Sequence, residues 1–235
     1  MIYVSNEEME EPRLASELLQ WVTTKLDQVG GTEGFRAALT AGKGGLKELV
    51  EEIYPLALWG KTLPNSHEVL LHPKIGSQNY DALVTDVRGL IEPFYVEITQ
   101  AHKGYQEYLR KVHLEREKWA PGSSGTVKST GTRARGLTVE TGRLLTALDA
   151  VVQETERLIE DAVSRKIQKT YPQSTRLLIV FEDMVIAREK GIEDKLRGAI
   201  NRAVAGHQIS FSHIYLVGST QRLNVVWSND VRLES

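Results

Sequence analysis

The stretch NYDALVTDVRGLIEPFYVEITQAHKG, residues 79–104, reads as two short apolar strands around a turn. Each strand carries one carboxylate, Asp81 or Glu97, where a buried sheet would favour an apolar side chain. These two acids are equally far from Gly89, so a turn centred near Gly89 places them opposite each other on paired strands. The stretch therefore predicts a hairpin in which the two carboxylates lie next to each other.

The chemistry of that place follows from its residue types. The alternation in FYVEIT puts Glu97 and Thr99 on one face of the strand, and the hairpin brings Asp81 to the same face, with Gln100 and Lys103 just beyond. Two close carboxylates repel unless a cation or a proton lies between them. Oxygen ligands without His or Cys favour Mg²⁺ or Mn²⁺, which retain water and bind phosphate. A metal-bound water that attacks a phosphodiester suits such a site.

Composition limits the alternatives. The chain has 235 residues, of which 41% are hydrophobic, and this favours one domain with insertions over two full domains. It contains no cysteine, which excludes disulfides, thiolate nucleophiles and cysteine-based zinc sites. No export signal and no apolar run long enough to span a membrane is visible, so we expect a cytoplasmic protein without membrane partners.

The charge is unevenly distributed along the chain. The formal net charge is −2, yet residues 103–135 carry eight basic side chains against three acidic ones. The Gly- and Ser-rich sequence WAPGSSGTVKSTGTRARG in this segment predicts a flexible basic loop. Such a loop is either an ordinary solvated surface segment or an arm that contacts phosphates without reading bases.

The periodicity of the whole chain predicts an α/β fold with the element order αβββαβαββ. After an N-terminal helix comes a second helix through LKELVEEIYPLALWG, where Pro55 marks an end or a kink. Three strands follow, then a helix at about 104–118, the basic loop and a long helix over about 138–170. The remainder predicts a strand, a helix and two final strands. The predicted organisation is a helical extension (1–35) and a main domain (36–235) with a basic insertion at about 104–137.

A helix, a meander with Asp on its second strand and Glu on its third, a long helix and a further strand resemble the PD-(D/E)XK nuclease superfamily. The resemblance covers roughly residues 36–227. It implies a restriction-endonuclease-like core, a mixed central sheet flanked by helices, and metal-dependent phosphodiester hydrolysis. Asp81 and Glu97 match the family's metal-binding acids, which implies Mg²⁺ or Mn²⁺ as cofactor and nucleic acid, DNA in the first place, as substrate. Thr99 stands where the family has its lysine.

Several residues are candidates to complete this site. Gln100, Lys103 or Lys166 would have to replace the missing lysine, and Glu52, preferred over Glu48 and Glu51, is the expected acid from the first helix. Candidate nucleic-acid contacts are Lys111, Lys128, Arg133, Arg135 and Lys166.

Two alternatives remain open at this point. The chain is either a nuclease or a nuclease-like module that binds nucleic acid or protein without cleavage. Asp81 and Glu97 could instead be exposed charges on a half-solvated sheet face. The sequence also leaves open whether the chain forms a homodimer.

Overall fold

The computed structural model of the chain describes residues 4–28, 45–118, 126–131, 138–142 and 147–229. Up to the end of the central hairpin, its elements are α1 (Asn6–Glu10), β1 (Arg13–Leu14), α2 (Ala15–Gln28), α4 (Leu46–Glu48), η1 (Leu49–Ile53), α5 (Tyr54–Gly60), β2 (Val69–Pro73), β3 (Ala82–Asp86) and β4 (Phe94–Gln100). The later elements are α6 (Gly104–Glu117), β5 (Thr126–Thr130), β6 (Thr138–Gly142), α7 (Leu148–Ile167), β7 (Thr175–Phe181), α8 (Ile192–Val204), β8 (His213–Gly218) and β9 (Asn224–Ser228).

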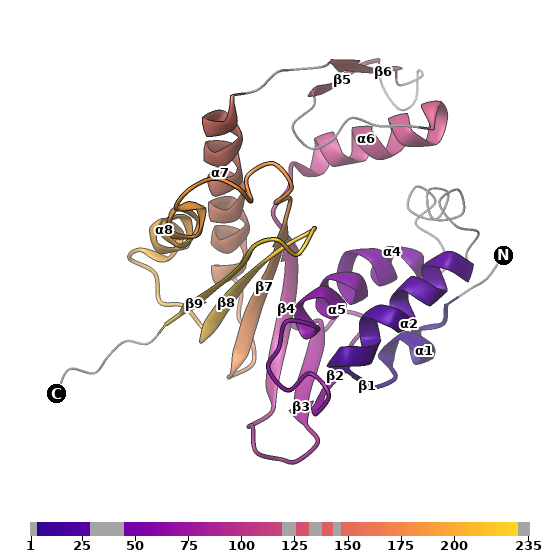
Figure 1. Cartoon of the computed structure of the whole chain (residues 1–235), viewed down its shortest axis with the longest axis vertical. Helices are drawn as coiled ribbons and strands as arrows, with labels where there is room; N and C mark the ends of the chain where they lie inside the picture. Colours follow the sequence, from indigo (N-terminus) through magenta and orange to yellow (C-terminus); the bar gives the residue numbers. More distant parts are fainter. Residues whose placement is uncertain (1–3, 29–44, 119–125, 132–137, 143–146, 230–235) are drawn as a thin grey trace.

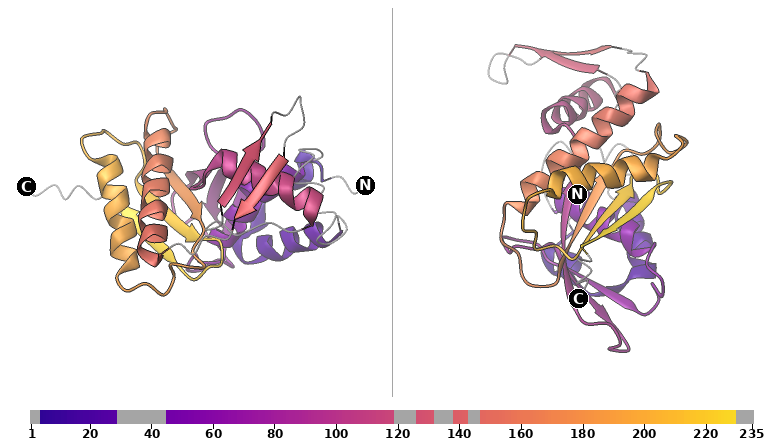
Figure 2. Two further views of the ribbon diagram at one scale, coloured as in Figure 1. Left: turned by 90° about the horizontal axis from the view of Figure 1, so that it is seen from above. Right: turned by 90° about the vertical axis from the view of Figure 1, so that its left-hand side faces the viewer.

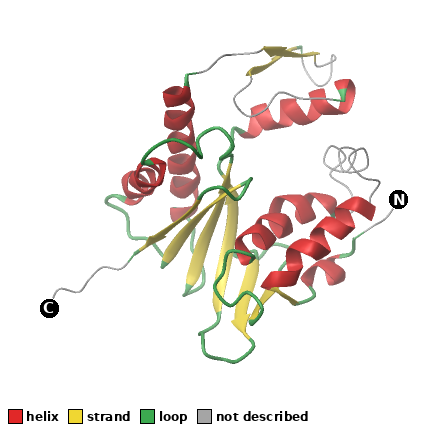
Figure 3. Ribbon diagram, in the orientation of Figure 1, coloured by secondary structure: helices red, strands yellow, loops and turns green. Residues whose placement is uncertain are grey.

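A mixed sheet of seven strands runs through the middle of the molecule in the order β1-β2-β3-β4-β7-β8-β9 (Figures 1 and 3). The strands from β1 to β4 are antiparallel neighbours, β7 and β8 continue parallel to β4, and β9 is antiparallel at the edge. Helices flank this sheet on both faces. The predicted α/β class and mixed central sheet are therefore confirmed.

The β3–β4 hairpin has the predicted register from Ala82 onward, but its ladder does not include the expected pair of Asp81 and Glu97. Three cross-strand pairs are placed symmetrically about Gly89: Ala82–Val96, Leu83–Tyr95 and Val84–Phe94. Gly89 has a backbone φ of 67°, in the left-handed region that glycine adopts without strain. The carboxylate of Asp86 accepts the backbone N–H groups of Arg88 and Leu90 at 3.2 and 2.9 Å, which stabilises the turn locally.

Two groups of helices cover opposite faces of the sheet (Figure 1). Helices α1, α2, α4 and α5 pack on one face, and α7 and α8 pack on the other. Successive residues of β7 point to opposite faces, so Leu178 belongs to the first core and Leu177 and Ile179 to the second. Coverage on both sides explains why β7 is apolar along nearly its whole length.

The N-terminal helices contribute to the first of these cores. Met9 and Leu18 are fully buried in the same cluster as Leu56 and Leu71. The predicted domain boundary between residues 35 and 36 lies outside the described residues. Within the described ranges, no helix combines the length and the apolar character needed to cross a membrane.

The basic insertion contains more regular structure than the sequence predicts. Helix α6 follows β4 as expected, but β5 and β6 pair as an antiparallel hairpin where the sequence predicted a loop and the start of a long helix. Val127 on β5 is buried with Leu109 on α6, and this small core stabilises strands rich in Thr and Val. The long helix therefore begins at Leu148, later than expected. The insertion lies beyond one end of the sheet (Figures 1 and 2).

The helical run from Leu46 to Gly60 is continuous but irregular. It passes through Pro55 instead of ending there, and the turn just before the proline, η1, is π-helical. Pro55 has no N–H, so the carbonyl of Glu51 lacks the donor that an α-helix supplies four residues later. The wider π-turn accommodates the proline within the helix.

Asp183 connects the ends of the neighbouring parallel strands β7 and β8. Its side chain is fully buried just after β7 and accepts four hydrogen bonds of 2.7–3.1 Å from the turn after β8. The donors are Thr220 N, Thr220 Oγ1, Arg222 N and Leu223 N. A Cβ atom on Gly218 would lie 2.0 Å from a carboxylate oxygen of Asp183, so position 218 requires glycine.

Candidate functional site

Asp81 lies where β3 begins to separate from β4. Ala82 is paired with Val96, and the N–H of Asp81 also donates to the Val96 carbonyl at 2.8 Å. Two consecutive residues, Asp81 and Ala82, thus face the single residue Val96, which is the pattern of a β-bulge. Bulges change the direction in which a side chain points. The Asp81 carboxylate turns toward β4 and accepts the N–H of Ile98, the residue after Glu97, at 2.6 Å.

The Asp81 carboxylate occupies a negative and poorly solvated position. Burial and then the neighbouring Glu97 carboxylate raise its pKa to about 6, although the Ile98 N–H and the positive charge of Lys166 oppose this shift. A carboxyl group whose pKa is raised in this way gains from a bound proton or cation. The two acids that the sequence brings together thus influence each other in the folded protein.

Glu97 is buried in the middle of β4, with 7% of its surface exposed. Its Oε1 forms a short ion pair with Nζ of Lys166 and accepts a hydrogen bond from Oη of Tyr171 at 3.4 Å. Burial and then the charge of Glu97 raise the pKa of Tyr171, so its phenol remains a donor. The alternative of an exposed charge on a half-solvated sheet face is therefore wrong for Glu97.

The partners of Glu97 arrive from a distant part of the sequence. Lys166 lies in the last turn of α7, and Tyr171 lies in the segment between α7 and β7. Because β7 runs parallel to β4, the chain that enters β7 passes the beginning of β4 and brings both residues to Glu97. Of the three candidates to replace the motif lysine, Lys166 is the one with an ion pair to Glu97.

The other residues proposed for this site point elsewhere or remain neutral. Lys103 forms an ion pair of 2.7 Å with Glu154 on α7. Nε2 of Gln100 donates to the backbone carbonyl of Glu51 in η1 at 3.4 Å. Thr99 is half-buried on β4, two residues after Glu97.

Glu52 contributes a third carboxyl group near Asp81. It lies on η1, and burial followed by the negative charges of Asp81 and Glu48 raises its pKa to about 7. The sequence prediction had preferred Glu52 over Glu48 and Glu51. The contribution of Asp81 to the raised pKa of Glu52 places these two carboxyl groups within electrostatic reach of each other.

Replacing Glu52 by Gln is expected to stabilise the metal-free protein at about pH 8 by roughly 1–2 kcal/mol, after allowance for solvent screening. The folded state holds a proton on Glu52 up to pH 7, whereas the unfolded chain releases it near pH 4.5. Wild-type stability therefore falls as the pH rises between these values, and the glutamine variant lacks this loss. Urea denaturation in the presence of a chelator measures the free energy of unfolding of both proteins.

The control for this change is Glu51→Gln, because Glu51 forms a surface ion pair with Lys47 at 4.0 Å. Glu51→Gln should give no stabilisation at about pH 8 or at about pH 4. At about pH 4, where folded and unfolded chains are both protonated, Glu52→Gln should match the wild type. Equal stability of Glu52→Gln and wild type at about pH 8 would show that Glu52 is not held in a negative environment.

The donor set fits a hard divalent cation bound by two carboxylates. In the described part of the chain, no three His, Cys, Asp or Glu side chains converge closely enough to hold a metal by themselves. Mg²⁺ is commonly bound by one or two carboxylates, with waters and substrate phosphates as its other ligands. Asp81 and Glu97, with oxygen donors and a raised Asp81 pKa, meet that requirement.

The candidate nucleic-acid contacts are only partly described. Lys128 is exposed on β5, Lys111 lies on α6, and Arg133 and Arg135 fall outside the described residues. Lys166, which the sequence also suggested for this role, is instead paired with Glu97 and has 15% of its side chain exposed.

Tyr171 and the bulge at Asp81 were missed by sequence reasoning. Tyr171 is 74 residues from Glu97 along the chain, and no local pattern links them. The bulge has a weak signal in the polar sequence SQNYD, which interrupts the approach to β3.

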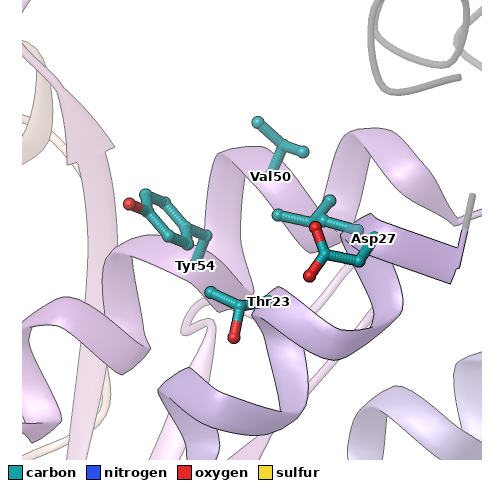
Figure 4. Close-up of a pocket in the computed structure, with 5 residues that line it drawn as sticks. Thr23, Asp27, Val50 and Tyr54 are labelled. Atoms are coloured by element: carbon teal, nitrogen blue, oxygen red, sulfur yellow. The ribbon is translucent and has the colours of Figure 1, made fainter. Parts of the chain in front are cut away.

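A surface cavity of about 290 Å³ lies between α2 and the helical run from Leu46 to Gly60 (Figure 4). Thr23, Leu26 and Asp27 from α2 form one wall, and Val50 and Tyr54 form the other. The cavity is mainly apolar and shares no residue with the cluster around Asp81 and Glu97.

Comparison with known proteins adds no relative, because no protein family, curated protein or solved structure matches this chain significantly.

Proposed function

We propose that this protein is a metal-dependent nuclease of the PD-(D/E)XK type whose lysine comes from a helix. One observation carries the proposal: the bulge turns the Asp81 carboxylate toward the middle of β4, where the Glu97–Lys166 pair lies. Two acids from adjacent strands beside one ammonium group are the charges that the family motif supplies. A helical run, a three-strand meander and a strand parallel to β4 also support the proposal.

In this proposal Asp81 and Glu97 hold Mg²⁺ or Mn²⁺. The bound cation would supply an activated water and offset negative charge on the phosphate. Lys166 keeps a fixed positive charge beside Glu97, in place of the neutral Thr99 hydroxyl. Tyr171 donates its phenolic proton to the same Glu97 oxygen and so helps to orient that carboxylate.

The substrate class follows from charge. The insertion and its flanks, residues 103–135, carry an excess of basic side chains over acidic ones in a chain that is acidic overall. The described part of this segment, α6 and β5, lies beyond the end of the sheet (Figure 2). Lys128 on β5 is exposed to solvent. Cations on a polar surface bind nucleic-acid phosphates without regard to sequence. We therefore propose nucleic acid, with DNA tested first, as the substrate.

A second function, binding without cleavage, is favoured by the charge balance of the same cluster. Lys166 already neutralises Glu97, so the site has one positive charge without any added cation. A nuclease-like module that binds nucleic acid or protein without cleavage would need no metal ion to balance the charge of Glu97.

A cleavage assay separates the two functions. Purified protein is incubated with single- and double-stranded DNA and RNA in the presence of Mg²⁺, Mn²⁺ or a chelator. The nuclease proposal expects cutting that requires metal and returns when metal is added back. Asp81→Asn, purified in parallel, is the control for a contaminating nuclease. A wild type that binds nucleic acid but cuts none of these substrates with either metal would leave only the binding module.

A further inference from the structure

Helices cover only part of the sheet face that carries Glu97. On that side α7 and α8 pack over β7, β8 and β9 (Figure 1), and the described core there takes its strand residues from these three strands. Alternation along β2 and β3 directs Leu70 and Leu83 to the same face. Both leucines are only half-buried and belong to none of the cores in the described part of the chain. This part of the face is therefore partly open to solvent.

Two tyrosines lie in this open part, beside the acid pair. Tyr95 stands two residues before Glu97 on the same face of β4, and Tyr80 directly precedes Asp81. Their ring centroids are 4.5 Å apart, with 46° between the ring planes, and both residues are half-buried. Tyr95 is paired across the strands with Leu83, so the rings continue into the half-buried apolar surface of β3.

Positive charge reaches the acids from the opposite side of β4. Lys166 is paired with Glu97, and Lys169, three residues later at the end of α7, is exposed. Burial and Glu97 raise the pKa of Asp81, and the charges of Lys166 and Lys169 act in the opposite direction. Both cations are therefore within electrostatic reach of Asp81. Acids, cations and partly exposed rings meet at the beginning of β4.

Aromatic rings beside cations are the features with which proteins bind single-stranded nucleic acid. Every base has a π-face that can stack on an aromatic side chain, and cations contact the backbone whatever the sequence. In a duplex the base faces are stacked on one another, so only an unpaired base can stack on a tyrosine. The combination favours an unpaired strand over a duplex as the molecule that covers this part of the face.

We propose that Tyr80 and Tyr95 form a stacking surface for an unpaired base, so that the site takes single-stranded nucleic acid. The inference deepens the proposed nuclease function and rests on it in taking nucleic acid as the ligand. Stacking needs no metal, so binding to the two tyrosines can be measured separately from cleavage.

The test is the binding of a single-stranded DNA that contains 2-aminopurine, a fluorescent base whose emission falls when it stacks, with a chelator present. The wild type should quench this emission. Tyr80→Leu and Tyr95→Leu should each weaken binding by about tenfold and reduce the quenching, as expected when one base loses an aromatic partner. Tyr80→Phe and Tyr95→Phe keep the rings and should bind like the wild type.

The matched control is Tyr54→Leu, which should bind and quench like the wild type. Tyr54 is also half-buried, but it lines the apolar cavity beside α2 and not the face that carries Glu97. Circular dichroism checks that each variant is folded. Tyr80 lies outside the β3–β4 ladder, so Tyr80→Leu carries the test even if Tyr95→Leu disturbs the strand.

Duplex DNA of the same sequence shows whether the loss is specific to stacking. The wild type should bind the single strand more tightly than the duplex. The leucine variants should bind the duplex within about twofold of the wild type, because phosphate contacts do not involve the rings. Equal weakening for single strand and duplex would overturn the stacking role.

The outcomes separate the two proposals. A wild type that binds and quenches the single strand but cuts nothing with metal supports the stacking surface and overturns the nuclease. A wild type that cuts with metal, with both leucine variants binding the single strand as it does, overturns the stacking surface alone. A wild type that binds no nucleic acid overturns both.

Discussion

Replacing Lys166 by Met should lower the rate of the proposed metal-dependent cleavage by about 10²–10³-fold, the usual effect of removing one group that stabilises charge in a transition state. Lys166 is the cation paired with Glu97, and its side chain is only 15% exposed. A fixed charge in a poorly solvated site acts more strongly on a reacting phosphate than one in water. Thr99, the residue at the motif position, remains neutral and cannot replace it.

The measurement is the single-turnover rate with saturating Mg²⁺, which separates chemistry from product release. Lys103→Met is the matched control, because Lys103 was an equal candidate by sequence and also forms an ion pair with a glutamate, Glu154. It should change the single-turnover rate by less than about threefold, since its ion pair is partly exposed. A larger loss in Lys103→Met than in Lys166→Met would assign the motif role to the wrong lysine.

Stability must be measured alongside the rate, because the loss of Lys166 leaves Glu97 with Tyr171 as its remaining hydrogen-bond donor among the described contacts. Removing one partner of a buried pair can cost about 3–5 kcal/mol. Lys166→Arg retains the charge and should preserve the fold, while its broad guanidinium cannot reproduce a point charge in the same place. Slow cleavage in a folded Lys166→Arg variant would therefore identify the effect as chemical.

The largest loss of stability is expected from Asp183→Ala, at about 3–5 kcal/mol. Four donors from the turn after β8 point at this one buried carboxylate. Without it, the buried N–H of Leu223 would be left unpaired, and the three part-buried donors of Thr220 and Arg222 would lose the acceptor that holds the turn. Asp183→Asn should also be harmful, because in either orientation its NH2 group replaces an oxygen that accepts two hydrogen bonds, either those from Thr220 or those from Arg222 and Leu223.

Urea denaturation followed by circular dichroism measures this loss, with Glu182→Ala as the control. Glu182 is the preceding residue, is exposed, and accepts a hydrogen bond from the nearby N–H of Met184. Its removal should cost less than about 1 kcal/mol. Gly218→Ala should resemble Asp183→Ala, because the added methyl group overlaps the same carboxylate. Wild-type stability in Asp183→Ala would mean that this turn does not depend on Asp183.

The central hairpin could be predicted because local rules determine it. Gly89 marked the turn, and alternation fixed which residues face each other. The β5–β6 hairpin was missed because its strands are short and depend on contact with Leu109, which belongs to a separate helix.

The acidic residues of the candidate site could be predicted from the sequence, but the side chains that surround them could not. Asp81 and Glu97 stand out as charges within apolar strands, but the direction of the Asp81 side chain depends on a one-residue bulge that alternation does not reveal. Lys166 and Tyr171 reach Glu97 only because β7 runs parallel to β4, which is a property of the whole sheet. Pro55, by contrast, indicated an irregular helix, although the sequence did not indicate that the irregularity would be a π-turn.

The ion pair between Lys103 and Glu154 has a consequence for how this chain could diversify. The chain leaves the sheet just after β4 and returns to the body in α7, and the ion pair connects the place of exit with α7. A segment whose two ends are anchored side by side can be lengthened, shortened or exchanged at little cost to the body that carries it. Selection could therefore alter what the insertion attaches to while the acids on the sheet stay unchanged. Attachment and chemistry would then evolve as separate traits of one chain.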